Sequence, residues 1–462
     1  MQRTLFWKIT LIGIVALLLQ IPVEMIRSLV AERKQARDGV IAEIARGSSD
    51  AQRIIGPVLY IPWMRRSSEA TTTVDDSGHS RTVRKDKIER GQVALLPATL
   101  SIEGNIDLQQ KHRGIYTAQV YTLNATLRGS FILPPEFGVS EGSGSLVWGR
   151  ALLVLGIQDT RGIRDGVKLD WDGVQAALFP GGVDAAGAPS GIHADLGVLP
   201  SGKAPAAHEF RIALSLLGTE RLDIVPVGAA TTVALNSAWP HPSFTGRLLP
   251  DAGTKITRVG FAAQWRTSHF ATNLAQLHQR CVQSRQCDAF TQHSLAVSFV
   301  QPVDLYQSVD RSVKYGFLFI GLTFAAFFLF EVLKQLAIHP VQYALVGVAL
   351  AIFFLLLISL SEHLGFAPAY AIAASSCVTL IGYYVAHVLK STRRGVLFAL
   401  ALSALYSLLY VLLRVEDHAL LMGSLLVFAC LAAAMVATRR VDWYAVAASP
   451  PLAEAPPGPK PA

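Results

Sequence analysis

The chain has 462 residues, of which 51% are hydrophobic and only 16% charged, and its formal net charge is +8. This composition is too apolar for an ordinary soluble enzyme, and the chain is too long for a membrane bundle alone, so we expect both a membrane part and a soluble part. Many of the Lys and Arg residues flank apolar segments, as expected for the cytoplasmic ends of membrane spans, which argues against nucleic-acid binding.

The first apolar segment, at residues 7–26 (WKITLIGIVALLLQIPVEMI), predicts an N-terminal membrane span. Arg3 and Lys8 form its basic edge, and no small-x-small cleavage pattern follows, so we expect an uncleaved anchor rather than a signal peptide. Residues 1–26 are therefore assigned to a cytoplasmic end and an anchor. The charged, helix-compatible stretch at 27–46 should extend this helix until Gly47 supplies a stop.

Residues 27–314 predict a large β-rich domain. Phe210, Ile212 and Leu214 alternate with polar or small residues, and the same period of two recurs at 259–265 and 295–299. Further strand candidates lie at 54–61, 92–96, 116–127, 152–157 and 231–235. Turn-forming pairs between them favour a mainly antiparallel sandwich or two packed sheets, as one domain or two. The polar residues 65–89 predict an exposed hairpin or a mobile loop.

The four cysteines divide between the two parts of the chain. Cys281 and Cys287 lie in the soluble segment, after a short helical candidate at 274–281, whereas Cys377 and Cys430 lie inside predicted spans. The first two could form a stapling disulfide if their segment faces an oxidising compartment. A redox-active pair would more often have the C-x-x-C spacing.

Five more apolar segments predict a helical membrane domain at residues 315–444. They lie at 315–333, 341–360, 367–389, 396–413 and 419–438. About 20 apolar residues cross roughly 30 Å of hydrocarbon as a helix, so the chain is expected to have six spans in all. The basic residues of the short loops then place both termini in the cytoplasm and residues 27–314 in the periplasm. The Pro-rich residues 445–462 predict a disordered cytoplasmic tail.

Several catalytic signatures are missing from the sequence. It contains no H-E-x-x-H, no phosphate-binding loop and no G-x-G-x-x-G after a strand, so we expect a non-enzymatic protein without a cofactor. The remaining candidates for function are ionisable residues near span ends: Glu331, Lys334, His339, Glu362, His363, Glu416, Asp417 and His418.

Their position favours an interfacial role. A charge in hydrocarbon is costly, but at span ends a side chain can snorkel to the interface, and Glu331 and Lys334 have the i, i+3 spacing of a helical ion pair. A proton-handling or pH-sensing cluster of the outer carboxylate and histidine pairs is the alternative. Metal binding there is less favoured, because its ligands would have to be assembled across loops.

Several of these segments resemble the CreD family of bacterial inner-membrane proteins. They are KYGFLFIGLTFAAFFLFE at 314–331, HPVQYALVG at 339–347, LLISLSEHLGF at 356–366, ALLMGSLLVF at 419–428, TRRVDWY at 438–444 and VSFVQPVDLYQSVDRSVKYGF at 297–317. The resemblance implies a Gram-negative cytoplasmic-membrane protein linked to cell-envelope integrity, colicin tolerance and the β-lactam response, usually under control of the CreBC two-component system. It implies no established reaction, ligand or catalytic residue.

Three functional hypotheses follow. The leading one is a non-enzymatic protein of envelope maintenance, whose periplasmic domain binds an envelope protein or a peptidoglycan or lipid-linked partner beside the lipid bilayer. The alternative is a transporter of a small molecule or lipid that uses this domain as a capture module. The third is an enzyme acting on lipid-linked envelope precursors. The oligomeric state stays open.

Overall fold

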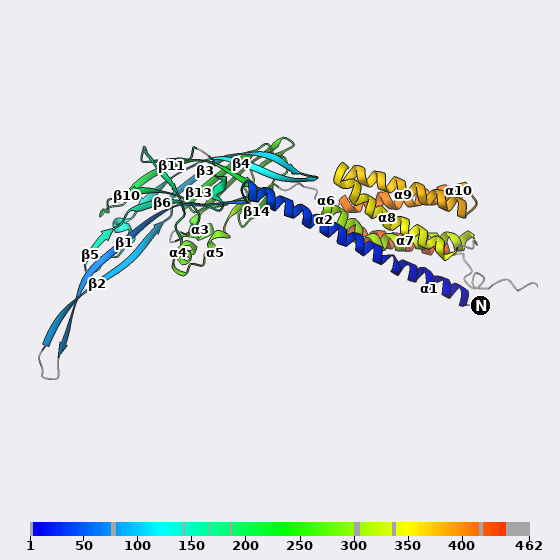
Figure 1. Ribbon diagram of the computed structural model, residues 1–462, viewed down its shortest axis with the longest axis horizontal. Helices are drawn as coiled ribbons and strands as arrows, with labels where there is room; N and C mark the ends of the chain where they lie inside the picture. The colour runs from blue at the N-terminus through cyan, green and yellow to red at the C-terminus, as the bar shows by residue number, and fades with distance from the viewer. Residues whose placement is uncertain are drawn as a thin grey trace, which may run out of the picture. The chain divides into compact units, whose positions relative to one another are not determined.

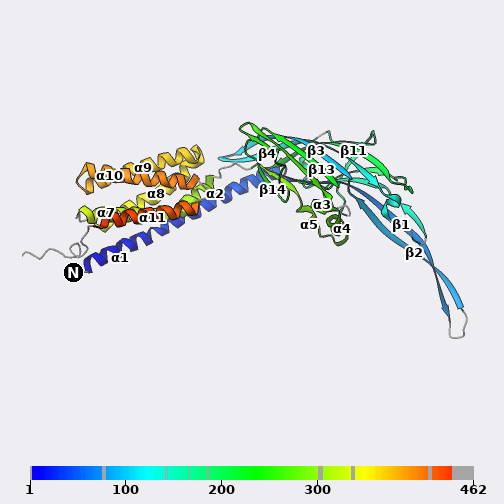
Figure 2. The same cartoon turned by 180° about the vertical axis from the view of Figure 1, so that it is seen from behind.

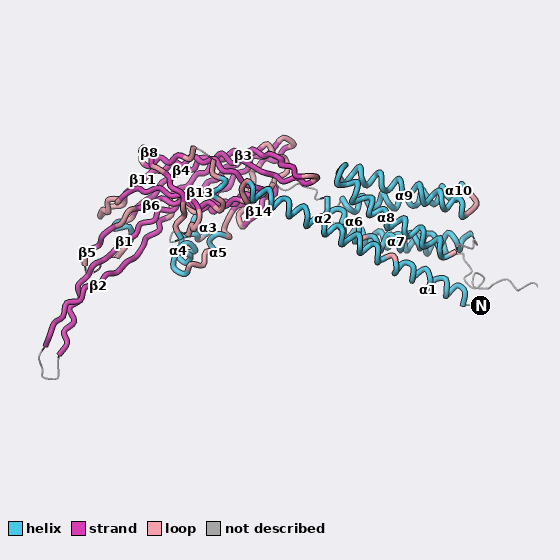
Figure 3. Tube along the Cα trace, in the orientation of Figure 1, coloured by secondary structure: helices cyan, strands magenta, loops and turns pink. Residues whose placement is uncertain are grey.

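The computed structural model describes residues 3–74, 80–140, 142, 144–164, 166–184, 187–299, 305–334, 339–414 and 419–439. The chain forms two compact units, one from Met1–Arg37 with Val303–Ala462 and the other from Asp38–Pro302. Helices build the first unit and strands build most of the second (Figure 3). The predicted tail at 445–462 and the candidates Glu416, Asp417 and His418 lie outside the described residues.

Eight long or bent helices supply the helical unit. They are α1 (Arg3–Leu18), α2 (Gln20–Gly47), α6 (Leu305–Lys314), α7 (Gly316–Lys334), α8 (Pro340–Leu364), α9 (Phe366–Val388), α10 (Thr392–Arg414) and α11 (Ala419–Thr438). The last ten residues of α2 belong to the other unit. Within the helical unit α8 packs against α1, α7 and α9, and α10 packs against α9 and α11 (Figure 2).

Four helices of the described chain are long and apolar enough to cross a membrane: Trp7–Gly47, Pro340–Leu364, Phe366–Val388 and Thr392–Leu413. A fifth candidate span exists if α6 and α7, which meet at a bend of 44°, are counted together. The predicted sixth span is a helix, but its apolar part, Leu421–Val436, is shorter. The structure thus supports four or five of the six predicted spans.

Two sheets build the β unit (Figure 1). The first has the order β14-β17-β12-β1-β6-β10-β9, with β2 and β5 also paired to β1, and the second has the order β15-β16-β13-β3-β4-β11-β7-β8. The bounds are β1 (Gln52–Val74), β2 (Ser80–Leu95), β3 (Thr99–Arg113), β4 (Tyr116–Leu133), β5 (Ser145–Trp148), β6 (Ala151–Ile157), β7 (Lys168–Trp171), β8 (Val174–Ala176), β9 (Leu178–Pro180), β10 (Gly191–Gly197), β11 (Ala206–Thr219), β12 (Arg221–Val225), β13 (Ala230–Ser237), β14 (Ser243–Gly246), β15 (Lys255–Thr257), β16 (Gly260–Ser268) and β17 (Leu295–Ser298).

Both sheets are mixed, which refines the expectation of a mainly antiparallel domain. Most pairs are antiparallel, but β1 pairs with β12 in parallel, and so does β13 with β3. Parallel neighbours need a long crossover connection, and here each crossover consists of several other strands, so local sequence cannot reveal it.

One hydrophobic core joins the two sheets. Alternate residues of β11, including Phe210, Ile212 and Leu214, are buried as their period of two predicts. They belong to the same core cluster as Ile54 of β1 and Ile102 of β3. The β-rich segment is therefore one domain rather than two.

The segment at 65–89 is a hairpin rather than a loop. β1 and β2 stay paired from Leu59 and Leu95 out to Val74 and Ser80, and this two-stranded arm extends well beyond the rest of its sheet (Figure 1).

A polar network fixes the end of α2 to the β unit. The buried Gln52 side chain donates to Ser49 Oγ at 2.6 Å, to Asp159 O at 2.8 Å and to Leu217 O at 2.9 Å. Arg161 donates to the carbonyl oxygen of Arg46 at 2.7 Å and to the Asp159 carboxylate at 2.6 and 2.9 Å. The hydrogen bonds from Arg161 lower the pKa of Asp159 to about 2.

Candidate functional site

Glu331 lies near the end of α7 and is only 5% exposed. Lys8 of α1 forms an ion pair with its Oε1 atom, and the hydroxyl of Tyr343 of α8 donates a hydrogen bond to Oε2 at 2.7 Å. The Tyr343 ring packs against Phe324 and Phe327 of α7. The Lys8–Glu331–Tyr343 cluster therefore connects three helices through one buried carboxylate.

The cluster adds partners to the Glu331 and Lys334 pair that helical spacing predicts. Two other helices bring a cation and a hydroxyl donor to the buried Glu331 carboxylate, which compensates the cost of burying it. Lys334 ends α7, and its side chain is not among those described.

His339 has a structural task at the same end of the unit. Its Nδ1 accepts a hydrogen bond from the backbone N–H of Val341 at 3.3 Å, and its own N–H donates to Gln342 Oε1 at 3.2 Å. This reciprocal pair is a capping box at the start of α8.

A second cluster surrounds Glu362 at the end of α8. The Tyr306 hydroxyl of α6 donates to Glu362 Oε1 at 3.0 Å, and Arg33 Nε of α2 lies 4.0 Å from the same atom. The Glu362 side chain is only 10% exposed. The guanidinium of Arg37 lies over the Tyr306 ring, 5.4 Å from its centre. We name these residues the Glu362 cluster.

His363 does not join the Glu362 cluster and is exposed. Successive residues of a helix point in different directions. The other predicted pair, at 416–418, lies outside the described residues, so a proton-handling role of the two outer pairs stays a prediction. Among the described residues no group of three or more His, Cys, Asp or Glu side chains could hold a metal ion.

The two clusters mark the two ends of α8. Tyr343 and Glu362 are 19 positions apart, which corresponds to about 28 Å along a helix, close to the roughly 30 Å thickness of bilayer hydrocarbon. The separation of the two clusters along α8 thus matches the thickness of an apolar layer.

Sequence reasoning missed Lys8, Tyr343, Tyr306 and Arg33 as partners. A signal existed for Lys8: it is one of two cations in the apolar helix α1, and Glu331 is the single carboxylate in α7, on the same predicted side of the membrane. The two tyrosines carry no such signal, because an aromatic residue in an apolar helix usually indicates packing.

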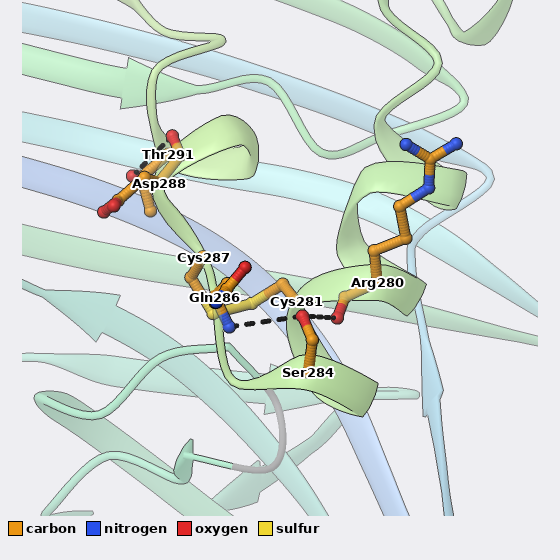
Figure 4. Close-up of a disulfide and its surroundings, with 7 residues drawn as sticks. All are labelled: Arg280, Cys281, Ser284, Gln286, Cys287, Asp288 and Thr291. Atoms are coloured by element: carbon orange, nitrogen blue, oxygen red, sulfur yellow. Dashed lines mark hydrogen bonds between the residues drawn. A yellow bond between two sulfur atoms is a disulfide. The ribbon is translucent and has the colours of Figure 1, made fainter.

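The β unit carries the disulfide between Cys281 and Cys287 (Figure 4). It joins the end of α4 (Leu274–Ser284) to the start of α5 (Asp288–Thr291). Leu274, His278 and Cys281 form the buried side of α4. The disulfide thereby fixes the end of one short helix to the start of the next.

The fixed helix forms one wall of a cavity of about 760 Å³. Gln279 and Gln283 of α4 line it, and Gln92 of β2 and Ile132 of β4 line it from the strands. His269 of α3 (His269–Thr272) completes a lining that combines amides with apolar groups. Its volume lies within the range of small-ligand sites.

The comparisons with known proteins point to one family. The family model described as "Inner membrane protein CreD" matches residues 4–444. The inner membrane protein CreD of Escherichia coli (strain K12) is 35% identical over 449 residues, which cover 96% of this chain and 95% of that protein.

Two crystal structures of a mutant M1 zinc metallopeptidase from Deinococcus radiodurans match at 8% and 7% identity, over 44% of this chain and 42% of theirs. Their TM-scores of 0.19 and 0.18 are too low to indicate a shared fold. The family match, in contrast, extends over nearly the whole chain. The chain belongs to the CreD family of inner membrane proteins.

Proposed function

We propose that this chain is a multi-pass inner-membrane protein of cell-envelope integrity, whose β unit lies in the periplasm and binds an envelope component there. The observation that carries the binding role is the 760 Å³ cavity beside α4. Among the described residues that line it there is no Lys, Arg, Asp or Glu, so this lining suits an uncharged amphipathic group.

Two features support the periplasmic side. Disulfides persist in the oxidising periplasm and are rare in the cytosol, and the β unit contains one. In the helical unit, Lys390, Arg393 and Arg394 lie at the turn between α9 and α10, as expected for a cytoplasmic loop. Both termini are then cytoplasmic, and α11 supplies the sixth span.

Site-specific photocrosslinking in intact cells tests the binding role. A photoreactive residue at Gln279, in the cavity, should give a defined adduct with an envelope component. The same residue at the exposed Gln264 of β16 is the matched control. Equal adducts from both positions, or none from Gln279, would contradict the proposal.

Reporter fusions test the orientation separately. A reporter that is active only in the periplasm should be active when inserted at the exposed turn between β15 and β16, and inactive at the turn between α9 and α10. The reverse pattern would place the β unit in the cytoplasm.

A further inference from the structure

A second cavity of the β unit, of about 510 Å³, is separate from the one beside α4. Arg53 of β1, Ser190, Arg285 and Asp288 line it, together with Asp184 and Thr291. The described lining of the first cavity has no Lys, Arg, Asp or Glu side chain, whereas this second cavity is lined by two arginines and two aspartates. The two cavities therefore suit ligands of different chemistry.

Arg53 is the unusual residue of this second cavity. Its Nε atom is buried and has no hydrogen-bond partner within the described chain. Its neighbour in register on β12 is Asp223, but that carboxylate is already bound by Arg221 at 2.7 and 2.8 Å and by Ser294 at 3.0 Å. A buried guanidinium N–H without an acceptor is costly, and an anionic ligand would remove this cost.

The other charged groups of the cavity come from the stapled segment. Arg285 follows α4 and lies within the loop that the Cys281–Cys287 bond closes. Asp288 begins α5 and directly follows Cys287 (Figure 4). Among the described residues, no ion pair joins Arg53 or Arg285 to Asp184 or Asp288. Positive and negative groups thus share one cavity without neutralising each other directly.

We propose that this cavity binds a small zwitterion that carries an ammonium group and a carboxylate or phosphate. Arg53 and Arg285 bind the anionic group, because a guanidinium matches the geometry of carboxylate and phosphate oxygens. Asp184 and Asp288 bind the ammonium group. A short peptide and a phosphoethanolamine headgroup both have this chemistry. The site is independent of the partner proposed for the first cavity.

Calorimetric titration of the full-length protein in detergent tests the inference. Alanyl-alanine and phosphoethanolamine represent the two sources of ligand, and inorganic phosphate and ethylamine each carry only one of the two charges. We expect saturable binding of at least one zwitterion, and binding of both single-charge probes at least about tenfold weaker. The tighter zwitterion identifies the source. Phosphate binding as tight as that of phosphoethanolamine, or no saturable binding, would overturn the proposal.

Variants assign the charges. Arg53→Gln should weaken binding of the zwitterion by about tenfold or more, Arg53→Lys by less, and Arg258→Gln, an exposed control on the other sheet, not at all. Asp288→Asn, at an exposed position, should weaken zwitterion binding and leave phosphate unaffected. Unchanged affinity in both Arg53→Gln and Asp288→Asn, with thermal midpoints like that of the natural chain, would refute the assignment.

Discussion

At the scale of single residues, Glu331 is a buried carboxylate whose charge is compensated by Lys8. Removing one partner of a buried ion pair leaves the other charge without compensation, whereas a matched pair contributes little by itself. We expect Glu331→Gln to lower the free energy of unfolding by about 1–3 kcal/mol, since the Lys8 side chain is 25% exposed and keeps some contact with the surroundings. Thermal unfolding of the full-length protein in detergent measures this loss.

A double-mutant cycle separates the ion pair from general damage. Lys8→Met combined with Glu331→Gln should cost less than the sum of the two single changes. Tyr343→Phe, which removes only one hydrogen bond to Glu331, serves as the matched control and should cost about 1 kcal/mol. Additive effects of the two charge changes would show that the pair is not coupled.

The partners of Glu331 show what sequence reasoning lacks at this scale. Helical spacing indicated Lys334, three positions away, because neighbours along one helix are all that a single segment reveals. The structure also brings Lys8 to Glu331 from 323 positions away. Which helix lies beside which is a property of packing, and it cannot be obtained from the period of one helix.

At the scale of elements, the network around Asp159 joins the end of a helix to two strands. The folded-state pKa of Asp159, about 2, is below the ordinary value of 3.8. Its ion pair therefore stabilises the fold above about pH 4, and this contribution is lost as the pH falls through 2. Because Arg161 is half exposed, we expect only about 1 kcal/mol after solvent screening.

The free energy of unfolding, measured with urea at pH 5 and at pH 2, checks this expectation. The natural chain should lose the contribution of the Asp159 ion pair between these two pH values, and Asp159→Asn should not show that loss. Arg161→Gln should remove the same pH-dependent contribution, since it deletes the guanidinium that donates hydrogen bonds to Asp159. Parallel stability curves for the natural chain and Asp159→Asn would contradict the role of this ion pair.

Element prediction succeeds where one face of a strand is regular. Every strand candidate from the sequence overlaps a strand, because alternate burial leaves a clear period of two, although the candidates at 92–96, 259–265 and 295–299 each extend one residue beyond it. β3 was not predicted from the sequence, because Gly104 interrupts its apolar face. The side chains of Leu123 and Leu235 fill the space that a Cβ at Gly104 would need, at 2.8 and 2.9 Å. The apolar groups that cover this position come from β4 and β13, so the pattern of β3 alone looks broken.

At the scale of the whole molecule, the cysteines differ between the two units. The β unit holds the Cys281–Cys287 disulfide, and the helical unit holds the free thiols of Cys377 and Cys430. Alkylation of the denatured protein purified from membranes should modify two cysteines without reductant and all four after reduction. Four reactive thiols without reductant would contradict both the disulfide and the oxidising location.

Loss of the disulfide should also weaken the β unit. The joint change Cys281→Ser and Cys287→Ser opens a loop with a sequence separation of 6, which predicts a loss of about 2 kcal/mol from chain entropy. Cys430→Ser is the control in the helical unit.

Composition and periodicity predicted both units, since apolar helices and alternating strands leave strong local signals. They could not predict the parallel pairs of β1 with β12 and β13 with β3, or the cavities between α4, α5 and the strands. Each depends on segments far apart in the sequence. The binding sites proposed for the β unit therefore become visible only in the folded chain.

The position of the β unit within the chain has a consequence for biogenesis. The helical unit is split, with Met1–Arg37 made first and Val303–Ala462 made last. Lys8 and Glu331 are 323 positions apart, so at about 5–20 residues per second roughly 16–65 s separate their emergence from the ribosome. Throughout that interval the first helix must be held in the bilayer without its counter-charge, while the whole β unit is synthesised. Pairing of Lys8 with Glu331 is therefore a late step of synthesis, because it must wait until the β unit has been made.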